Sequence, residues 1–158
     1  MMTRPPSPAP LAPDAHTWSE LSRLAGALMH EVSMLMAHLT QPGAQATDEA
    51  HRERLECGAR AARAADHVIE RLLEVPEMVG PGKAVMCFLN ALLAWHRAEL
   101  DNSPLQSRHQ RLLQQATVAV LATCLQVEAR ASDERFRLIE LGLTPTMPTP
   151  RRRPQSLH

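Results

Sequence analysis

A histidine followed directly by a glutamate, His30-Glu31, is the pair in this sequence best suited to chemistry. The pair lies in the stretch LSRLAGALMHEVSMLMAHL, where apolar residues recur at spacings of three and four. That spacing is typical of an amphipathic helix that packs against partner helices, and His30 falls outside the apolar stripe. We therefore expect its imidazole to face solvent, where it can act as a nucleophile toward a phosphoryl group brought by another protein.

The helix that positions this pair has recognisable ends. The residues Thr17-Trp18-Ser19-Glu20 fit the S/T-x-x-E capping box that starts many helices. The helix should end near Thr40, because Pro42-Gly43 cannot continue it. Its apolar stripe consists of Leu21, Ala25, Leu28, Val32, Leu35 and Leu39.

A second helix is predicted from just after Thr47 to about Val75, before Pro76. Asp48 and Glu49 in its first turn favour the positive end of the helix dipole. Small residues in its apolar seam would let a neighbouring helix approach closely. The seam consists of Gly58, Ala61, Ala65, Val68, Leu72 and Val75, with Ile69 and Leu73 widening the face.

These two helices are joined by a short connection, which favours an antiparallel hairpin. A hairpin alone cannot cover apolar faces this wide. We therefore expect a homodimer in which two hairpins form a four-helix bundle, with the contact along residues 21–39 and 58–75.

The rest of the chain divides by composition. The expected segments are a Pro-rich tail over 1–13, the hairpin over 14–75, a linker over 76–82, a small mostly helical unit over 83–143, and a Pro/Arg tail over 144–158. Both tails are expected to be disordered. Helices are predicted over Lys83–Leu100 and from Ser103 to about Ala131, and Arg135–Leu141 is a possible short strand because its apolar residues alternate. The predicted fold class is mainly α.

Composition and charge exclude several classes of function. The 158 residues are 44% hydrophobic and contain no tyrosine, which suits a helix bundle, and 17 basic residues balance 17 acidic ones, which disfavours nucleic-acid binding. The N-terminus has no apolar leader and no uninterrupted run of 18 apolar residues follows, so we expect a cytoplasmic protein that is not in a membrane. The three cysteines form no C-x-x-C pair, which indicates reduced core thiols and no metal site.

Two stretches together carry a family resemblance. Residues 24–31, LAGALMHE, and residues 59–73, ARAARAADHVIERLL, resemble the dimerisation and phosphoacceptor hairpin of bacterial sensor histidine kinases, over about residues 19–75. The resemblance implies that His30 is the phosphoacceptor and that Glu31 hydrogen-bonds its imidazole and takes a proton. Met34 stands where that family usually has a polar Asn or Thr.

The remainder of the chain lacks the parts of an ATP-dependent kinase. Such kinases hold the nucleotide phosphates with glycine-rich boxes, and after Gly82 the only glycine is Gly142. Residues 83–143 resemble at most a shortened, degenerate ATPase domain. This pattern is similar to that of histidine phosphotransferases, which carry a phosphoryl group between response-regulator receivers without ATP.

The predicted function is therefore phosphotransfer through His30, with no cofactor. Met29, Met34 and Ala37 are the predicted docking surface for the partner, because methionine adapts well at transient interfaces. The partner is a response-regulator receiver or a histidine kinase. The alternative is a non-catalytic pseudo-kinase or dimerisation module that binds and modulates one of these proteins.

Overall fold

The computed structural model describes residues 14–40 and 47–142. The described residues are helical almost throughout and contain no strand, so the mainly α prediction is confirmed. The elements are α1 (Ala15–Thr40), α2 (Asp48–Leu72), the 3-10 helix η2 (Pro76–Met78), α3 (Val79–Leu100) and α4 (Gln106–Glu140). The two predicted tails, residues 1–13 and 144–158, lie outside the described residues.

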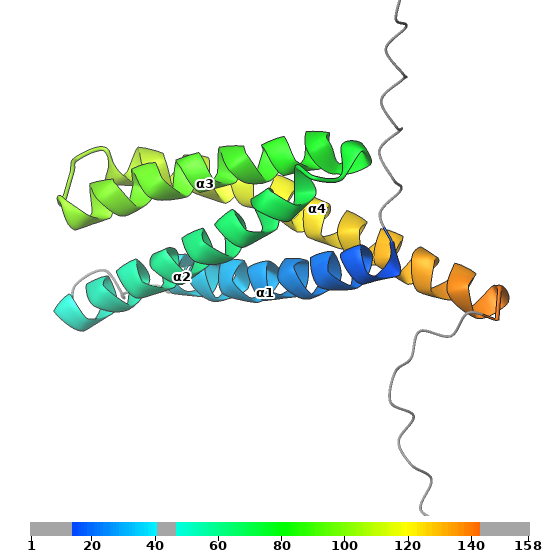
Figure 1. Ribbon diagram of the computed structural model, residues 1–158. Helices are drawn as coiled ribbons and strands as arrows, with labels where there is room; N and C mark the ends of the chain where they lie inside the picture. Colours follow the sequence, from blue (N-terminus) through cyan, green and yellow to red (C-terminus); the bar gives the residue numbers. More distant parts are fainter. Residues whose placement is uncertain (1–13, 41–46, 143–158) are drawn as a thin grey trace, which may run out of the picture.

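One chain forms a four-helix bundle by itself (Figure 1). α1 packs against α2 and α4, and α3 packs against the same two helices. α1 and α2 run antiparallel as predicted, because Glu20 near the start of α1 pairs with Arg71 at the end of α2, and His38 near the end of α1 pairs with Glu53. Within this one chain, α3 and α4 cover the apolar faces of the hairpin.

Both predicted apolar seams lie in the core of this bundle. Every residue of the predicted α1 stripe and of the predicted α2 seam is buried. Ile69 is buried as well, whereas Leu73, the residue after the end of α2, is 42% exposed. The largest buried side chains include Trp18, Phe88 and Trp95. Trp95 packs where α2 carries Gly58, as the small residues of the seam predict.

Of the two helix starts predicted for the hairpin, that of α1 differs from its capping signal and that of α2 agrees. α1 begins earlier than the Thr17 motif indicates, because the Asp14 carboxylate accepts a hydrogen bond from the backbone N–H of Thr17 at 2.9 Å. That bond lowers the pKa of Asp14. α2 begins after Thr47 as predicted, and the hydroxyl of Thr47 accepts from the backbone N–H of Ala50.

The predicted strand was wrong, and the segment predicted as a linker is helical. Arg135–Leu141 is not a strand: α4 continues through Glu140, because arginine, leucine and glutamate are good helix formers and an alternation this short is weak evidence. The expected linker over 76–82 is also structured. It contains η2 and the first turn of α3, in which Gly82 lies against Leu72 and Leu73.

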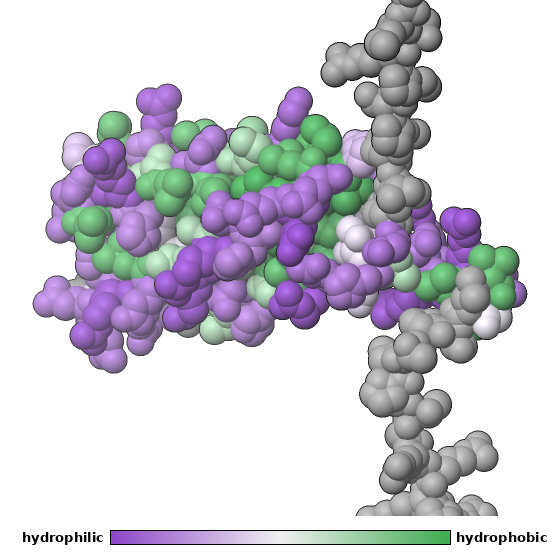
Figure 2. Space-filling model, in the orientation of Figure 1, coloured by the Kyte–Doolittle hydropathy of each residue, from purple (hydrophilic) through white to green (hydrophobic). Residues whose placement is uncertain are grey.

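Two helices in the second half of the chain each contain a long apolar window. By length and composition alone, Pro76–Leu100 and Gln106–Glu140 are long and apolar enough to cross a membrane, with 33% of each apolar window buried inside the bundle. Core helices of bundles have the same properties. Figure 2 shows apolar surface over α3, and the exposed apolar residues of the two helices include Leu93, Leu100, Val118 and Leu125.

Candidate functional site

The structure places His30 where the spacing predicts it. His30 lies midway along α1, is exposed, and belongs to the side opposite the buried stripe. Among the residues that the structure describes it forms no hydrogen bond and no ion pair. A free imidazole on a helix that is anchored by its other face is open to attack a group carried by a partner.

Glu31 is directed toward α2 rather than along the exposed face of α1. Its Oε2 lies 3.3 Å from Nε of Arg60, and Arg60 also donates from Nη2 to the sulfur of Cys57 at 3.1 Å. Successive residues of a helix point about 100° apart, so adjacent side chains do not face each other. The predicted contact between Glu31 and His30 is therefore replaced, in this arrangement, by an ion pair with Arg60.

The predicted docking residues divide into two kinds. Met34, 40% exposed, and Ala37 share the outer side of α1 with His30. Met29 is half-buried and packs against the core. Of the three predicted docking residues, Met34 and Ala37 are therefore the two that present exposed surface beside the histidine.

A buried charge cluster at one end of the bundle was missed by the sequence analysis. Glu99 at the end of α3 is 1% exposed, and its Oε1 accepts hydrogen bonds from Nε and Nη2 of Arg54 at 2.9 and 2.7 Å. Nδ1 of His51 lies 3.0 Å from the same oxygen, and the side-chain amide of Gln106 donates to Oε2. The cluster therefore ties α2, α3 and α4 together, beside a polar cavity of about 290 Å³.

The signal for this cluster was present in the sequence. Glu99 continues the spacing of three and four that Phe88, Leu92 and Trp95 set on α3, so it falls on a buried face. Arg54 precedes the apolar seam of α2 in the same way. Two opposite charges in register with two apolar seams predict a buried pair, because an isolated buried charge is too costly to persist. All the acceptor oxygens of Glu99 are used, which favours a structural role.

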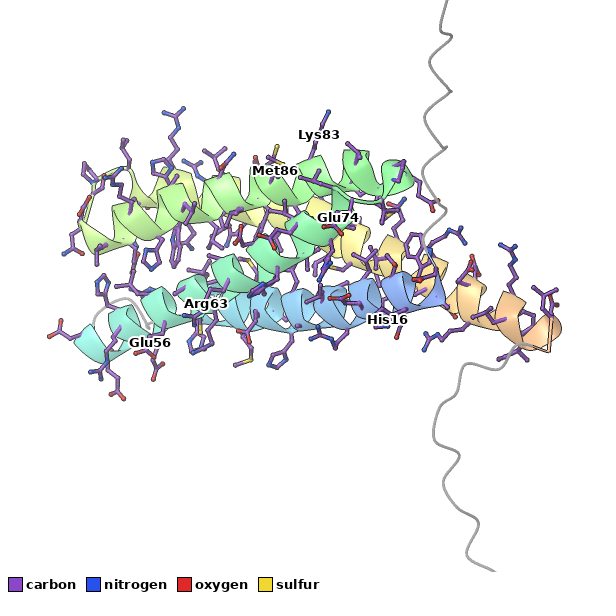
Figure 3. All side chains as sticks on the ribbon, in the orientation of Figure 1. His16, Glu56, Arg63, Glu74, Lys83 and Met86 are labelled. Atoms are coloured by element: carbon purple, nitrogen blue, oxygen red, sulfur yellow. The ribbon has the colours of Figure 1, made fainter. Side chains whose placement is uncertain are left out.

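A second cavity is lined in part by Glu31, the residue that follows His30. It measures about 300 Å³ and is formed between α1 and α2. Arginines line it from both helices: Arg23 comes from α1, whereas Arg60 and Arg63 come from α2. Figure 3 shows Arg63 midway along α2, beside α1. We call this cavity the α1/α2 groove.

The thiols are divided between core and surface. Cys57 and Cys124 are buried and Cys87 on α3 is exposed. Burial raises the pKa of Cys57, and burial with the nearby Glu128 carboxylate raises the pKa of Cys124 to about 11. In the part of the chain that the structure describes, no three His, Cys, Asp or Glu side chains come together as a metal site.

Comparisons with protein-family models, with curated proteins and with solved structures gave no match to this chain.

Proposed function

We propose that this protein carries a phosphoryl group on His30, accepting it from the phosphorylated aspartate of one response-regulator receiver and passing it to another. The exposure of His30 supports the proposal most directly. Its ring stands free on the outer side of α1, while the other side of the helix is fixed in the core of a four-helix bundle. The histidine is thus both accessible and held by a rigid element.

The transfer requires a neutral imidazole and an aspartyl phosphate whose phosphorus–oxygen bond lies in line with the attacking ring nitrogen. One ring nitrogen of His30 donates its lone pair to the phosphorus of the aspartyl phosphate, and the bond from phosphorus to the aspartate oxygen breaks. The aspartate leaves as a carboxylate with the electron pair. The proton on the second ring nitrogen passes to water, which reaches the exposed ring. The reverse sequence of steps delivers the group to the next receiver.

The proposal contains no step that uses ATP. The sequence after residue 82 has no glycine-rich stretch that could hold nucleotide phosphates. Residues 79–140 instead supply α3 and α4, the two helices that cover the phosphoacceptor hairpin. We place the protein in the cytoplasm, together with the receivers it would serve.

Two observations favour the alternative, a non-catalytic module that binds a kinase or receiver. The Glu31 carboxylate is engaged by Arg60, and Met34 offers no hydrogen bond one turn beyond His30. A module of this kind would use the same exposed side of α1 and act by competition. A homodimer, in either case, would have to use surfaces outside the two buried seams.

The two functions differ in whether the His30 ring becomes phosphorylated. Purified protein is incubated with a panel of phosphorylated receivers, and phosphate that is acid-labile but base-stable is measured on wild type, His30→Ala and His16→Ala. His16 is a matched control, because it is an exposed histidine on the same helix (Figure 3). The proposal predicts label on wild type and His16→Ala but none on His30→Ala. Tight binding of a receiver with no label on wild type would establish the alternative.

A further inference from the structure

The α1/α2 groove gathers positive charge within a hairpin that is acidic overall. Between residues 14 and 75 the sequence has ten carboxylates and six arginines. Three of those arginines, Arg23, Arg60 and Arg63, nevertheless line one cavity of about 300 Å³. The one carboxylate in its lining is Glu31. The groove therefore has a local excess of positive charge.

That excess is not neutralised by neighbouring side chains. Glu31 pairs with Arg60. Arg23 and Arg63 are exposed and form no ion pair or hydrogen bond with any residue that the structure describes. In contrast, Arg71 of the same helix pairs with both Glu20 and Glu74. Two guanidinium groups thus remain available on opposite walls of the groove.

The remaining lining of the groove is mostly apolar. Leu24 and Ala27 of α1 and Ala64 of α2 line the groove together with the arginines. The two small alanine side chains leave room for a compact group between the two helices. His67 of α2 also lines the groove.

The groove also lies next to the proposed phosphoacceptor. Ala27 precedes His30 by three residues and Glu31 follows it directly, and both line the groove. Residues three apart on a helix are neighbours on its surface. Arg23 precedes His30 by seven residues, two turns of the helix, so a group bound by Arg23 and Arg63 would lie on the side of α1 that His30 occupies.

We propose that the α1/α2 groove is an anion site that binds the phosphoryl group of a phosphorylated receiver and presents it to His30. Guanidinium groups bind phosphate oxygens in a two-pronged geometry, which gives both affinity and orientation. Arg23 and Arg63 are the binding residues. This inference rests on the proposed phosphotransfer and adds the means by which the group is held.

The first test measures anion binding directly. Inorganic phosphate is titrated into the full-length protein at constant ionic strength, and backbone amide shifts of Ala27 and Ala64 are followed by NMR. Saturable shifts are expected in wild type and in His30→Ala. Replacing both arginines, Arg23→Gln with Arg63→Gln, should weaken binding at least tenfold, because each charged hydrogen bond contributes about a factor of ten. Arg97→Gln, an exposed arginine on α3, is the matched control and should bind as wild type does.

The second test measures transfer from a phosphorylated receiver. The double arginine variant should need at least tenfold more receiver for half-maximal rate, while still placing the phosphate on His30. Unchanged phosphate binding and unchanged receiver dependence in the double variant would overturn the groove inference and leave His30 phosphotransfer standing. Absence of transfer in wild type, with phosphate still bound in the groove, would instead overturn the proposed function and, with it, the assigned ligand.

Discussion

The carboxylate of Glu31 and the guanidinium of Arg60 join α1 to α2, with Nε of Arg60 3.3 Å from Oε2 of Glu31. The side chains are 23% and 44% exposed, so the pair contributes about 0–1 kcal/mol to stability. Its larger consequence is directional. It holds the Glu31 carboxylate at the neighbouring helix, on the side to which helix geometry already directs it.

This relationship predicts a modest role for Glu31 in phosphotransfer. Glu31→Gln should retain more than a tenth of the wild-type rate, because the carboxylate is held by Arg60 and water can take the imidazole proton. His30→Ala should retain no activity. Single-turnover transfer from a phosphorylated receiver measures both. A loss in Glu31→Gln as complete as that in His30→Ala would show that Glu31 leaves Arg60 and serves as the proton acceptor.

Gly58 on α2 should not tolerate even one added methyl group. A Cβ at this position would lie 2.8 Å from Cζ3 of Trp95 and 3.2 Å from Cδ2 of His96, inside the packed contact between α2 and α3. Gly58→Ala should therefore lower the free energy of unfolding by about 1–3 kcal/mol. Urea denaturation measures the change.

Gly26 provides the matched control for that substitution. It also lies inside a helix, but a Cβ there would meet nothing closer than Glu128 Oε1 at 4.0 Å. Gly26→Ala should raise the free energy of unfolding by about 0.5–1 kcal/mol, because alanine favours the helix over glycine. Equal effects in the two variants would contradict the close approach of Trp95 to α2.

The buried cluster around Glu99 should be sensitive to loss of one partner and tolerant of loss of both charges. Glu99→Ala leaves Arg54 buried without the carboxylate it contacts through two nitrogens, at an expected cost of about 3–5 kcal/mol. The double variant Arg54→Met with Glu99→Leu should cost less than the single one, because it removes the buried guanidinium together with the carboxylate. Thermal and urea unfolding of both variants provide the comparison. A double variant less stable than the single one would refute this account of the cluster.

Stability should fall at alkaline pH because of a buried thiol. An unfolded cysteine titrates near pH 9.0, whereas the pKa of Cys124 in the fold is raised to about 11. Between these values unfolding releases a proton, so the free energy of unfolding, constant with respect to this group below pH 9, decreases as pH rises toward 11. The raised pKa of Cys57 acts in the same direction.

Few other groups interfere in this pH window. The sequence has no tyrosine, and Lys83 is its one lysine. Urea unfolding at intervals from pH 7.5 to 10.5 should show the fall, and Cys124→Ala should reduce its slope. An identical slope in the variant would remove Cys124 as the cause.

The sequence predicted the hairpin because each of its signals is local. The stripe from Leu21 to Leu39 and the seam from Gly58 to Val75 repeat every three or four residues, and every member is buried. The identity of the helices that cover these apolar faces does not follow from a local pattern. Nothing in the spacing distinguishes a second copy of the hairpin from α3 and α4 of the same chain, since both would present apolar helices of similar length.

The candidate site likewise has features that local sequence predicts and features that depend on how the helices pack. Exposure of His30 followed from its place outside the stripe, because helix periodicity alone decides it. The pairing of Glu31 with Arg60 and the gathering of Arg23 with Arg63 depend on the register between α1 and α2. That register brings together residues about 30 to 40 positions apart, and no pattern within either helix determines it.

Phosphate on the His30 ring is the measurement that tests the central claim most directly. Full-length protein is incubated with a phosphorylated receiver, separated from it at alkaline pH, and cleaved into peptides for mass spectrometry. The account predicts one phosphorylated peptide, containing residues 24–52 after cleavage at arginine, with base-stable phosphate on His30 that is lost in acid. Phosphate on another residue, or an unmodified peptide although the receiver has lost its phosphate in a complex with this protein, would contradict it.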